Sequence, residues 1–405
     1  NPAATGEGSV GQTLPVSPMR KAWSVPWRVL VGLLLALPIL AILGSLLSSA
    51  DPIFGQKLKE ILDLFKLEKL PEYLFRGFYV LLFAYLIAGL LAHSVWPRKE
   101  ARRPEPEKAP FQGFLGPIET GVILGAVDLM FLLFVAVQFR YFFAGEANIT
   151  ASGYTYSEYA VRGFNELVAV AVLSLLLYQG LILIRRNRVE SRQISFRVLS
   201  LLLLGLVLVM LVSSWQRLGL YENAYGFTRL RTYTHLFIPW LGGLLLITAV
   251  LELFQRRGRF ALALWLVCIG FGLSLSAVNV DGFIVRQNTA RAAAGEEFDF
   301  DYLSELSHDG VPAMLAGLQQ AADASAVQET LGAQLACRTA IMKDAETTPW
   351  KGLTLSEQQA RRILLDAGNQ SLWSEHRITI GSDRTDYQVM VDGKLMHCQS
   401  WRDWD

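Results

Sequence analysis

Residues 165–184 read NELVAVAVLSLLLYQGLILI, and this stretch decides the fold class. A helix needs about 20 predominantly apolar residues to cross the hydrocarbon core of a bilayer, which is the length of this stretch. Backbone polar groups in lipid must be satisfied within the segment, so an isolated run of this kind forms a helix. The run therefore predicts a membrane-spanning helix, and Arg185 and Arg186 mark its end.

Six further stretches have the same character. The predicted spans are 28–49, 75–96, 118–142, 165–184, 195–215, 235–254 and 260–279. The composition agrees, since 52% of the 405 residues are hydrophobic and only 18% are charged. A net charge of +1 argues against a nucleic-acid partner, which requires a basic face. We expect an all-α transmembrane bundle that contacts membrane lipids.

Lysine and arginine residues predict the orientation, because basic residues concentrate in cytoplasmic loops. Four groups of basic residues lie at the ends of spans. Arg20, Lys21 and Arg28 lie at the start of span one, and Arg98, Lys99, Arg102, Arg103 and Lys108 follow span two. Arg185, Arg186, Arg188, Arg192 and Arg197 lie between spans four and five, and Arg256, Arg257 and Arg259 lie between spans six and seven. All four share one side only if the N-terminus is cytoplasmic. Seven spans then place the C-terminus outside the cell.

The predicted organisation has three parts. Residues 1–25 form a polar cytoplasmic linker without a signal peptide, and a chain that starts at Asn1 is expected to be a piece of a longer protein. Residues 26–280 form the seven-span domain. Within it, 53–70 has helical apolar spacing among mixed charges, which predicts an amphipathic helix lying either on the outer membrane face or on the outer domain.

Residues 281–405 predict a small extracytoplasmic α+β domain. TLSEQQARRILLDAGN begins with a capping box from Thr354 to Glu357, and Gly368 is expected to stop that helix. The segments HRITIGS and DYQVMVDGKLMHCQ alternate like strands, and Asp392-Gly393 between apolar runs indicates a hairpin.

The three cysteines divide between the two predicted domains. Cys268 lies in the seventh span and is expected to be a small buried apolar residue. Cys337 and Cys398 both lie in the outer domain, where an oxidising compartment permits a disulfide. Closing this loop would contribute about 4 kcal/mol in the chain-entropy model. The alternative is two buried free thiols; no CxxC or CxxH spacing favours a metal.

Three polar segments lie at the predicted outer ends of the spans. The first, TYSEYAVRGFNEL, spaces Glu158, Arg162 and Glu166 four residues apart, so that they share one helix face. The second segment precedes the sixth span, and its ionisable residues are Glu222, Arg229, Arg231 and His235. The third segment follows the seventh span, and its ionisable and amide residues are Asn279, Asp281, Arg286, Asn288 and Arg291. We expect the three segments to converge, as a structural network, as a binding site, or as a catalytic site.

Asp128, in ILGAVDLMFLLF, falls near the middle of the third span. An ionisable group at that depth costs a few kcal/mol unless it is paired or protonated, which makes it a candidate functional residue. The alternative is a neutral side chain that bonds to a neighbouring helix. Among catalytic motifs, the sequence contains no GxSxG, HExxH, phosphate loop or dinucleotide fingerprint in the right context, so no cofactor or metal is predicted.

Several ordered segments resemble bacterial membrane proteins of the DUF4173 family and its DUF4153 relative: PWRVLVGLLLALPILAILGSLLSSADPIF, FRYFFAG, TYSEYAVRGFNELVAVA, AYGFTRLR, NVDGFIVRQNTAR and DYLSELSHDGVPAM. The resemblance covers about residues 25–316. It implies a bacterial plasma membrane and no particular activity. Where the family reads EYARRGFFEL, this chain has Val161 and Asn165, and Gly310 stands where alanine is expected.

We therefore expect a non-enzymatic membrane subunit that senses or binds a ligand at the outer face, or that scaffolds an assembly with a protein partner. One alternative is a transporter or channel component that uses Asp128 as an ion or proton relay. Paired Gly/Pro breaks in repeated halves, which such folds often show, are not evident. Another alternative is a membrane enzyme acting on lipid or glycan, with Glu158 or Glu166 as acid or base.

Overall fold

The computed structural model describes residues 18–64, 115–144, 163–185, 191–296, 298–321, 325–344, 354–380, 387–391 and 393–398, with single positions at Arg76, Tyr79 and Phe83. Within these ranges, six helical segments are long and apolar enough to cross a membrane: Val25–Ala50, Pro117–Phe139, Phe164–Ile184, Ile194–Tyr225, Arg229–Leu253 and Arg257–Val278. Each coincides with a predicted span. The remaining prediction, 75–96, lies outside the described residues except at those three positions.

The chain divides into two compact units. The first contains α1 (Pro18–Ala50), α2 (Pro52–Leu64), α4 (Pro117–Ala144), α7 (Phe164–Ile184) from Asn165 onward, and α8 (Ser191–Tyr225) as far as Met210. Helix α2 confirms the helical part of the 53–70 prediction up to Leu64.

Helices α1 and α4 pack closely and run in the same direction. A Cβ on Gly32 would lie 2.9 Å from the Cβ of Val122, and one on Gly44 would lie 3.5 Å from the sulfur of Met130. Small residues allow membrane helices to approach in this way. The N-terminus of α2 joins the same core, where the rings of Phe54 and Phe134 meet edge to face at 5.1 Å.

Helix α7 runs antiparallel to α4. The backbone N–H of Leu115, just before α4, donates to the carbonyl of Ile184 at the end of α7. Helix α8 packs against the same end of α7, where the guanidinium of Arg185 lies 4.3 Å from the ring centroid of Phe196. These contacts place the start of α4, the end of α7 and the start of α8 next to one another.

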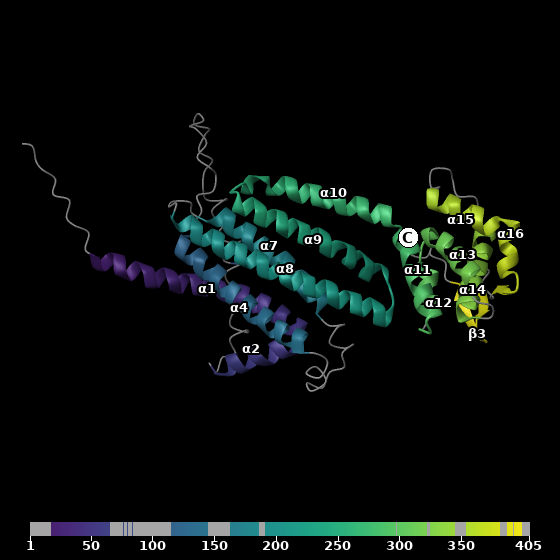
Figure 1. Ribbon diagram of the computed structural model, residues 1–405, viewed down its shortest axis with the longest axis horizontal. Coiled ribbons are helices and arrows are strands. Elements are labelled where there is room, and N and C mark those ends of the chain that lie inside the picture. The colour runs from purple at the N-terminus through teal and green to yellow at the C-terminus, as the bar shows by residue number, and fades with distance from the viewer. Residues whose placement is uncertain are drawn as a thin grey trace, which may run out of the picture. The chain divides into compact units, whose positions relative to one another are not determined.

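The second unit contains the end of α8, α9 (Arg229–Leu253) as far as Leu251, η1 (Arg257–Arg259), α10 (Phe260–Val278) and the described residues that follow. Helices α9 and α10 run side by side (Figure 1). The indole Nε1 of Trp240 donates to the hydroxyl of Ser274, and the Trp240 ring leaves no room for a side chain at Gly270.

Helix α10 is exposed along most of its length, and only Ala263 in it is buried. Cys268 is exposed, so the expectation that it is buried is wrong. The physical reason is that an apolar helix can face either lipid or protein, and both environments accept a small thiol.

The C-terminal region, residues 280–398, builds a helical core. Its helices are α11 (Val280–Ala293), α12 (Phe300–Glu305), η2 (His308–Gly310), α13 (Val311–Gln320), α14 (Ala326–Asp344), α15 (Leu355–Leu365), α16 (Ala367–Gln370) and η4 (Ser371–Trp373). Apolar residues of α11, α13, α14 and α15 share one cluster that includes Ile284, Met314, Leu331 and Leu364.

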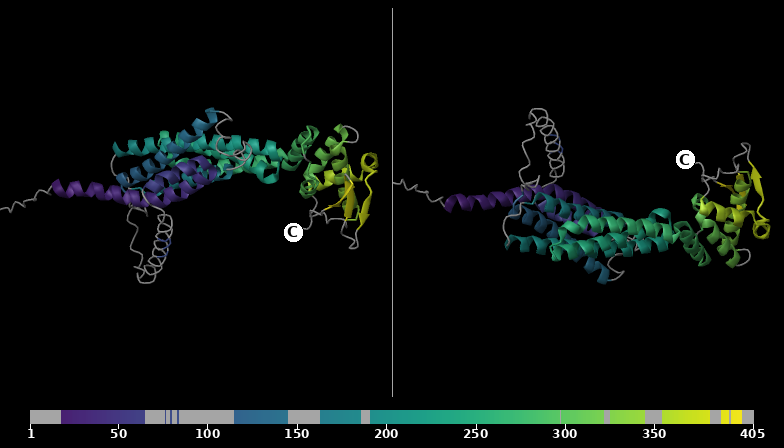
Figure 2. Two further views of the ribbon diagram at one scale, coloured as in Figure 1. Left: turned by 90° about the horizontal axis from the view of Figure 1, so that it is seen from below. Right: turned by 90° about the horizontal axis from the view of Figure 1, so that it is seen from above.

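Three antiparallel strands complete the region: β1 (Ile378–Ile380), β2 (Tyr387–Val391) and β3 (Lys394–Cys398), in the order β1-β2-β3. Figure 2 shows the strands together beside the helices of this region. Val391 pairs with Lys394, which confirms the hairpin, and Gly393 has the positive φ that such a turn requires. Asp392 lies outside the described residues.

The disulfide prediction is confirmed. Cys337 on α14 is bonded to Cys398 at the end of β3, with the two Cα atoms 5.5 Å apart. Both cysteines are buried in a second apolar cluster with Val389. The bond therefore fastens the sheet to the longest helix of the C-terminal region.

The helix start at Thr354 is also confirmed, because the Thr354 hydroxyl accepts the backbone N–H of Glu357. Gly368 is not the stop. Helix α15 ends at Leu365, and the Asp366 side chain then caps α16, which includes Gly368. A short polar side chain at an N-cap satisfies free N–H groups and so restarts a helix where the glycine suggested an end.

Candidate binding and coupling site

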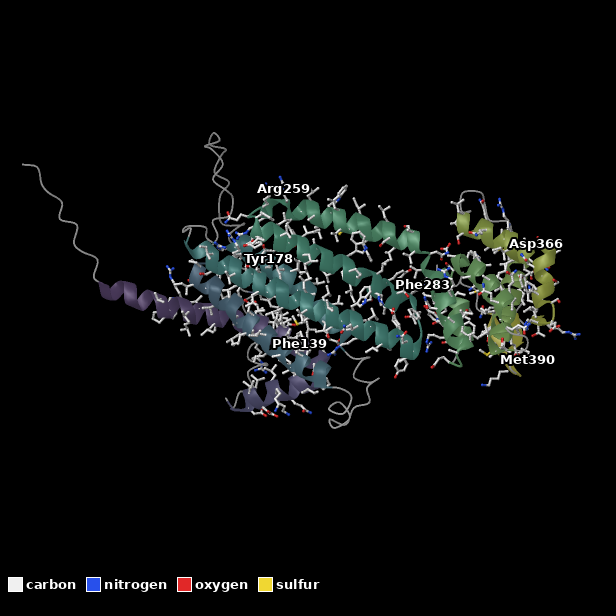
Figure 3. The ribbon with its side chains drawn as sticks, viewed as in Figure 1. Phe139, Tyr178, Arg259, Phe283, Asp366 and Met390 are labelled. Atoms are coloured by element: carbon white, nitrogen blue, oxygen red, sulfur yellow. A yellow bond between two sulfur atoms is a disulfide. The ribbon has the colours of Figure 1, made fainter. Side chains whose placement is uncertain are left out.

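Two of the three predicted polar segments come together in the second unit. They are the loop between α8 and α9 and the whole of α11. Phe283, labelled in Figure 3, lies on α11 at this place, and its ring meets that of Phe227 edge to face at 5.6 Å. We call the polar contacts around these two rings the joint.

An ion pair forms the centre of the joint. The Arg229 guanidinium at the start of α9 donates from Nε to Oδ1 of Asp281 at 2.8 Å and from Nη2 to Oδ2 at 2.5 Å. Oδ2 also accepts the backbone N–H of Ser307 at 2.7 Å. The Asp281 side chain is only 7% exposed. One carboxylate therefore connects a membrane helix, α11 and the segment that precedes η2.

The charge state of Asp281 follows from these contacts. Burial would raise the pKa of the carboxyl, but the hydrogen bonds from Arg229 and Ser307 and the positive charge of Arg229 outweigh it, so the pKa lies below its ordinary value. Asp281 is a carboxylate at neutral pH, and the pair is fully charged.

Tyr302 adds a second connection to the same arginine residue. Its hydroxyl accepts the backbone N–H of Arg229 at 2.6 Å, which satisfies one of the N–H groups left free at the start of α9. Burial raises the pKa of Tyr302, so the phenol stays protonated.

Asn288 holds the backbone of the α8–α9 loop. Its Oδ1 accepts the N–H of Phe227 at 2.8 Å, and its Nδ2 donates to the carbonyl of the same residue at 2.9 Å. Gly226 has φ of 80°, and a Cβ there would lie 2.7 Å from Nη1 of Arg291 and 3.1 Å from Oδ1 of Asn288. A glycine is needed at 226 both for its backbone conformation and for this close approach.

Two arginines satisfy the carbonyl groups at the end of α8. Arg291 donates to the carbonyls of Asn223 and Ala224, and Arg231 donates to those of Tyr225 and Gly226. Cations are favourable at a helix C-terminus, where carbonyl groups lack intrahelical partners. The Arg231 guanidinium also lies 3.9 Å from the ring centroid of Tyr221.

Asn279 makes the turn from α10 into α11. It adopts the left-handed conformation with φ of 44°, its Oδ1 accepts the N–H of Gly282, and its Nδ2 donates to the carbonyl of Asp309. Asparagine tolerates this conformation better than most residues. The turn fixes the position of Asp281 two residues later.

A buried arginine extends the joint into the C-terminal region. The Nη2 of Arg338 lies 2.9, 3.4 and 2.8 Å from the carbonyl oxygens of Leu303, Ser304 and Leu306. Those carbonyls immediately precede Ser307, whose N–H binds Asp281. Burial lowers the pKa of Arg338 to about 10, against the attraction of the Asp281 carboxylate. Arg338 therefore remains charged at neutral pH and orders the segment that binds Asp281.

A polar pair lies further along the α8–α9 hairpin. Nδ1 of His235 lies 2.7 Å from Oε2 of Glu222, whose side chain is almost fully buried. The ring of Trp215 contacts His235 with the centroids 3.9 Å apart. Both ionisable residues belong to the predicted second segment, and they face each other across the hairpin.

A family model described as a domain of unknown function, DUF4153, matches residues 11–317. The chain belongs to the DUF4153 family. No curated protein and no solved structure shows significant similarity to it. In this DUF4153 protein the family match includes Arg229, Asp281 and Asn288, whereas Arg338 and the disulfide lie beyond it. The DUF4173 part of the resemblance is not confirmed.

The first predicted segment is described only in part. Glu158 and Arg162 lie outside the described residues. Glu166 lies in the first turn of α7, where Oε1 accepts a 3.5 Å hydrogen bond from the Ser49 hydroxyl. The second and third segments are thus in direct contact, and their role as a binding site stays a prediction. For the first segment the contact itself stays a prediction.

Asp128 lies where the sequence places it, at the middle of a span, with 3% of its surface exposed. Neither carboxyl oxygen has a hydrogen-bond partner among the described residues. The predicted bond from a neutral Asp128 to another helix is therefore not present in this part of the chain.

Sequence reasoning missed Tyr302, Ser307 and Arg338. Ser307 acts through its backbone, which carries no residue-specific signal. Arg338 had a signal, because LACRTAIM places a lone arginine in an otherwise apolar stretch of a helix that is buried almost continuously. A charge on a buried face requires partners, and here they are backbone carbonyls.

Proposed function

We propose that this DUF4153 protein is a sensing or scaffold subunit of a bacterial plasma membrane, in which the C-terminal region binds a ligand or protein partner and the joint couples that region to the membrane helices. The proposed topology places the N-terminus in the cytoplasm and the C-terminal region outside. One observation carries the proposal: the Asp281 carboxylate is bound at once by Arg229 of a membrane helix and by the backbone of Ser307 in the C-terminal region.

The physical argument is that a buried ion pair has few alternative geometries. Moving α11 relative to α9 would separate the half-exposed Arg229 guanidinium from the buried Asp281 carboxylate, which would lose both of its bonds to Arg229. We therefore expect a displacement of α11 to move α9 with it, because the bonds of Asp281 connect the two helices directly. Arg338 supports the same path, because it orders the segment that carries Ser307.

The first part of the test identifies the partner. The full chain would be purified in a gentle detergent from its native membrane, and copurifying proteins and lipids would be identified by mass spectrometry. Lysine cross-linking would then locate the partner. The proposal expects cross-links to Lys343 and Lys394 in the C-terminal region. A partner that cross-links only to Lys57 and Lys59 on α2 would contradict it.

The second part measures coupling. Hydrogen exchange in α9 would be followed with and without the partner, in the unaltered chain and in Asp281→Asn. We expect partner binding to protect α9 in the unaltered chain and to have at least a several-fold smaller effect in the variant. Asp309→Asn is the matched control, because Asp309 is an exposed aspartate on the adjacent η2. Equal protection in both variants would show that the joint does not couple.

A second candidate function is a transporter or channel component. The buried position of Asp128 in mid-span, without a hydrogen-bond partner among the described residues, favours it. The test is ion or proton flux through proteoliposomes containing the full chain. Flux that falls at least tenfold in Asp128→Asn would support transport, and flux indistinguishable from empty vesicles would exclude it.

The proposed enzyme alternative has less support. Glu158 lies outside the described residues, and Glu166 accepts a hydrogen bond from the Ser49 hydroxyl, which would not tune it for proton transfer. In the residues described, no three His, Cys, Asp or Glu side chains are grouped as a metal site would require.

A further inference from the structure

The turn between α9 and α10 concentrates positive charge. Arg256, Arg257 and Arg259 lie within it, and Arg259 is labelled in Figure 3. The backbone N–H of Arg259 donates to the carbonyl of Arg256 at 3.0 Å, which closes a turn of the 3₁₀ type. Residues i and i+3 eclipse each other in this geometry, so the side chains of Arg256 and Arg259 leave the backbone on the same side.

These two guanidinium groups have no acidic partner among the described residues. Arg256 and Arg259 are both exposed, and no ion pair in this part of the chain includes either of them. The acid nearest to them in sequence is Glu252, which is fully buried and accepts the Tyr178 hydroxyl at Oε2 over 2.7 Å. Arg229, at the opposite end of α9, is instead part of the ion pair of the joint. The turn therefore presents an uncompensated positive charge to its surroundings.

Apolar side chains adjoin the turn on both sides. Leu253 and Phe254 precede it, with exposed fractions of 54% and 67%. Leu262 and Trp265 follow it on α10, with exposed fractions of 58% and 64%. Only 6% of the apolar window in the span Arg257–Val278 is buried inside the protein. In a bilayer, an apolar surface of this kind faces the acyl chains of lipids, so the cationic turn continues directly into a lipid-facing surface.

We propose that the α9–α10 turn binds the headgroup of an anionic phospholipid, with Arg256 and Arg259 on the phosphate and the acyl chains along α10. Guanidinium groups donate paired N–H groups to phosphate oxygens, and such charge-assisted bonds are about twice as strong as neutral ones. A membrane lipid fits the turn better than free phosphate, because exposed apolar side chains begin directly beside the two arginines. In the proposed topology the turn is cytoplasmic, so the lipid belongs to the inner leaflet.

This lipid site goes beyond the proposed function and does not depend on it. The 25 residues of α9 separate the turn from the joint, a distance of about 36 Å along the helix. Asp281→Asn, which breaks the ion pair of the joint, should therefore leave lipid binding unchanged. A failure of coupling through the joint would bear on the sensing function alone.

The test measures lipid affinity with the full chain in detergent. Native mass spectrometry would follow the binding of phosphatidylglycerol to the delipidated chain, with phosphatidylcholine as the zwitterionic reference. We expect phosphatidylglycerol to bind more tightly and to saturate first at one molecule per chain. Raising the salt concentration should weaken its binding, because the attraction between exposed charges is screened.

Replacing both arginines tests the assignment to this turn. Each basic residue near an anionic membrane surface contributes about fivefold to binding, so Arg256→Gln with Arg259→Gln should lower the affinity for phosphatidylglycerol at least about tenfold. The matched control is Arg286→Gln with Arg362→Gln, which removes the same charge from exposed arginines on α11 and α15 and should leave the affinity unchanged. Arg256→Lys with Arg259→Lys keeps the charge that orients the helices, and it should retain more of the affinity than the glutamine pair.

Three outcomes would overturn the assignment. Equal affinities of the unaltered chain for the two lipids would show that headgroup charge is not recognised, whatever the variants do. Equal losses in the glutamine pair and in its control would indicate a general effect of net charge and not a site at this turn. Displacement of the lipid by inorganic phosphate, at constant ionic strength, would assign the two arginines to a soluble anion.

Discussion

Two buried aspartates represent the two units of this molecule and have opposite surroundings. Asp281 is bound by two nitrogens of Arg229 and by the N–H of Ser307. Asp128 has no hydrogen-bond partner among the described residues, although it is buried to a similar degree. Burial alone therefore does not decide the state of a carboxyl group. The donors around it decide whether it is a charged structural connection or a group that must take up a proton.

The same contrast extends to the regions around them. The C-terminal region is held by specific polar bonds and a disulfide, and changes there should have large effects on stability. The membrane helices are held by apolar surfaces and small residues, and loss of one polar group should matter less. The following predictions test this difference, beginning with the largest expected effect.

Replacing Cys337 and Cys398 by serine should destabilise the C-terminal region by about 4 kcal/mol, because the closed loop between them no longer restricts the unfolded chain. Pulse proteolysis of the full chain, read out with fragments from α14 and the sheet, would measure the loss. Cys268→Ser is the matched control on exposed α10 and should leave the region unchanged. A loss below about 1 kcal/mol would show that the buried clusters hold the sheet without the bond.

Asp281→Asn should destabilise the joint by about 2 kcal/mol. A buried pair broken on one side costs roughly 3 to 5 kcal/mol, and the 37% exposure of the Arg229 side chain reduces that figure. Thermal unfolding of the purified chain would show a lower melting temperature than for Asp309→Asn. An equal melting temperature for the two variants would indicate that water replaces the ion pair at no cost.

The stability of the joint should depend on pH through Asp281. Its pKa in the folded chain lies below the ordinary 3.8, so the unfolded state binds the proton more readily. The contribution is complete above the ordinary pKa and is lost as the pH falls through the folded one. Melting temperature measured from pH 6 downward should therefore fall more steeply in the unaltered chain than in Asp281→Asn. Parallel curves would show that another group titrates.

Asp128→Asn should change the melting temperature least. If the residue is neutral when folded, an amide of the same shape preserves the charge and most of the packing, so the change should be within about 1 kcal/mol. Asp128→Leu should be neutral or stabilising, because it removes two buried polar atoms that have no hydrogen-bond partner among the described residues. A loss above about 3 kcal/mol in Asp128→Asn would mean that a charged Asp128 has a strong partner.

Six spans and the strand hairpin were predictable from the sequence because each depends on local composition, as in residues 165–184 and at Gly393. The meeting of the α8–α9 loop with α11 was predictable in outline, since the topology puts both at one end of their helices. The individual bonds were not predictable. Asn288 and Arg338 bind backbone atoms, which any sequence supplies, and the exposure of Cys268 depends on which face of an apolar helix meets protein.

The joint also has a consequence for biosynthesis. The bonds of Phe227, Arg229 and the end of α8 to α11 link residues 52 to 68 positions apart, and the whole of α10 is synthesised between them. The carbonyls of Asn223 and Ala224 can bind Arg291 only after α11 has been translated. If α10 failed to insert, α11 would be left on the opposite side of the membrane from Arg229, and none of these bonds could close. Formation of the joint thus serves as a check on the correct insertion of the last span.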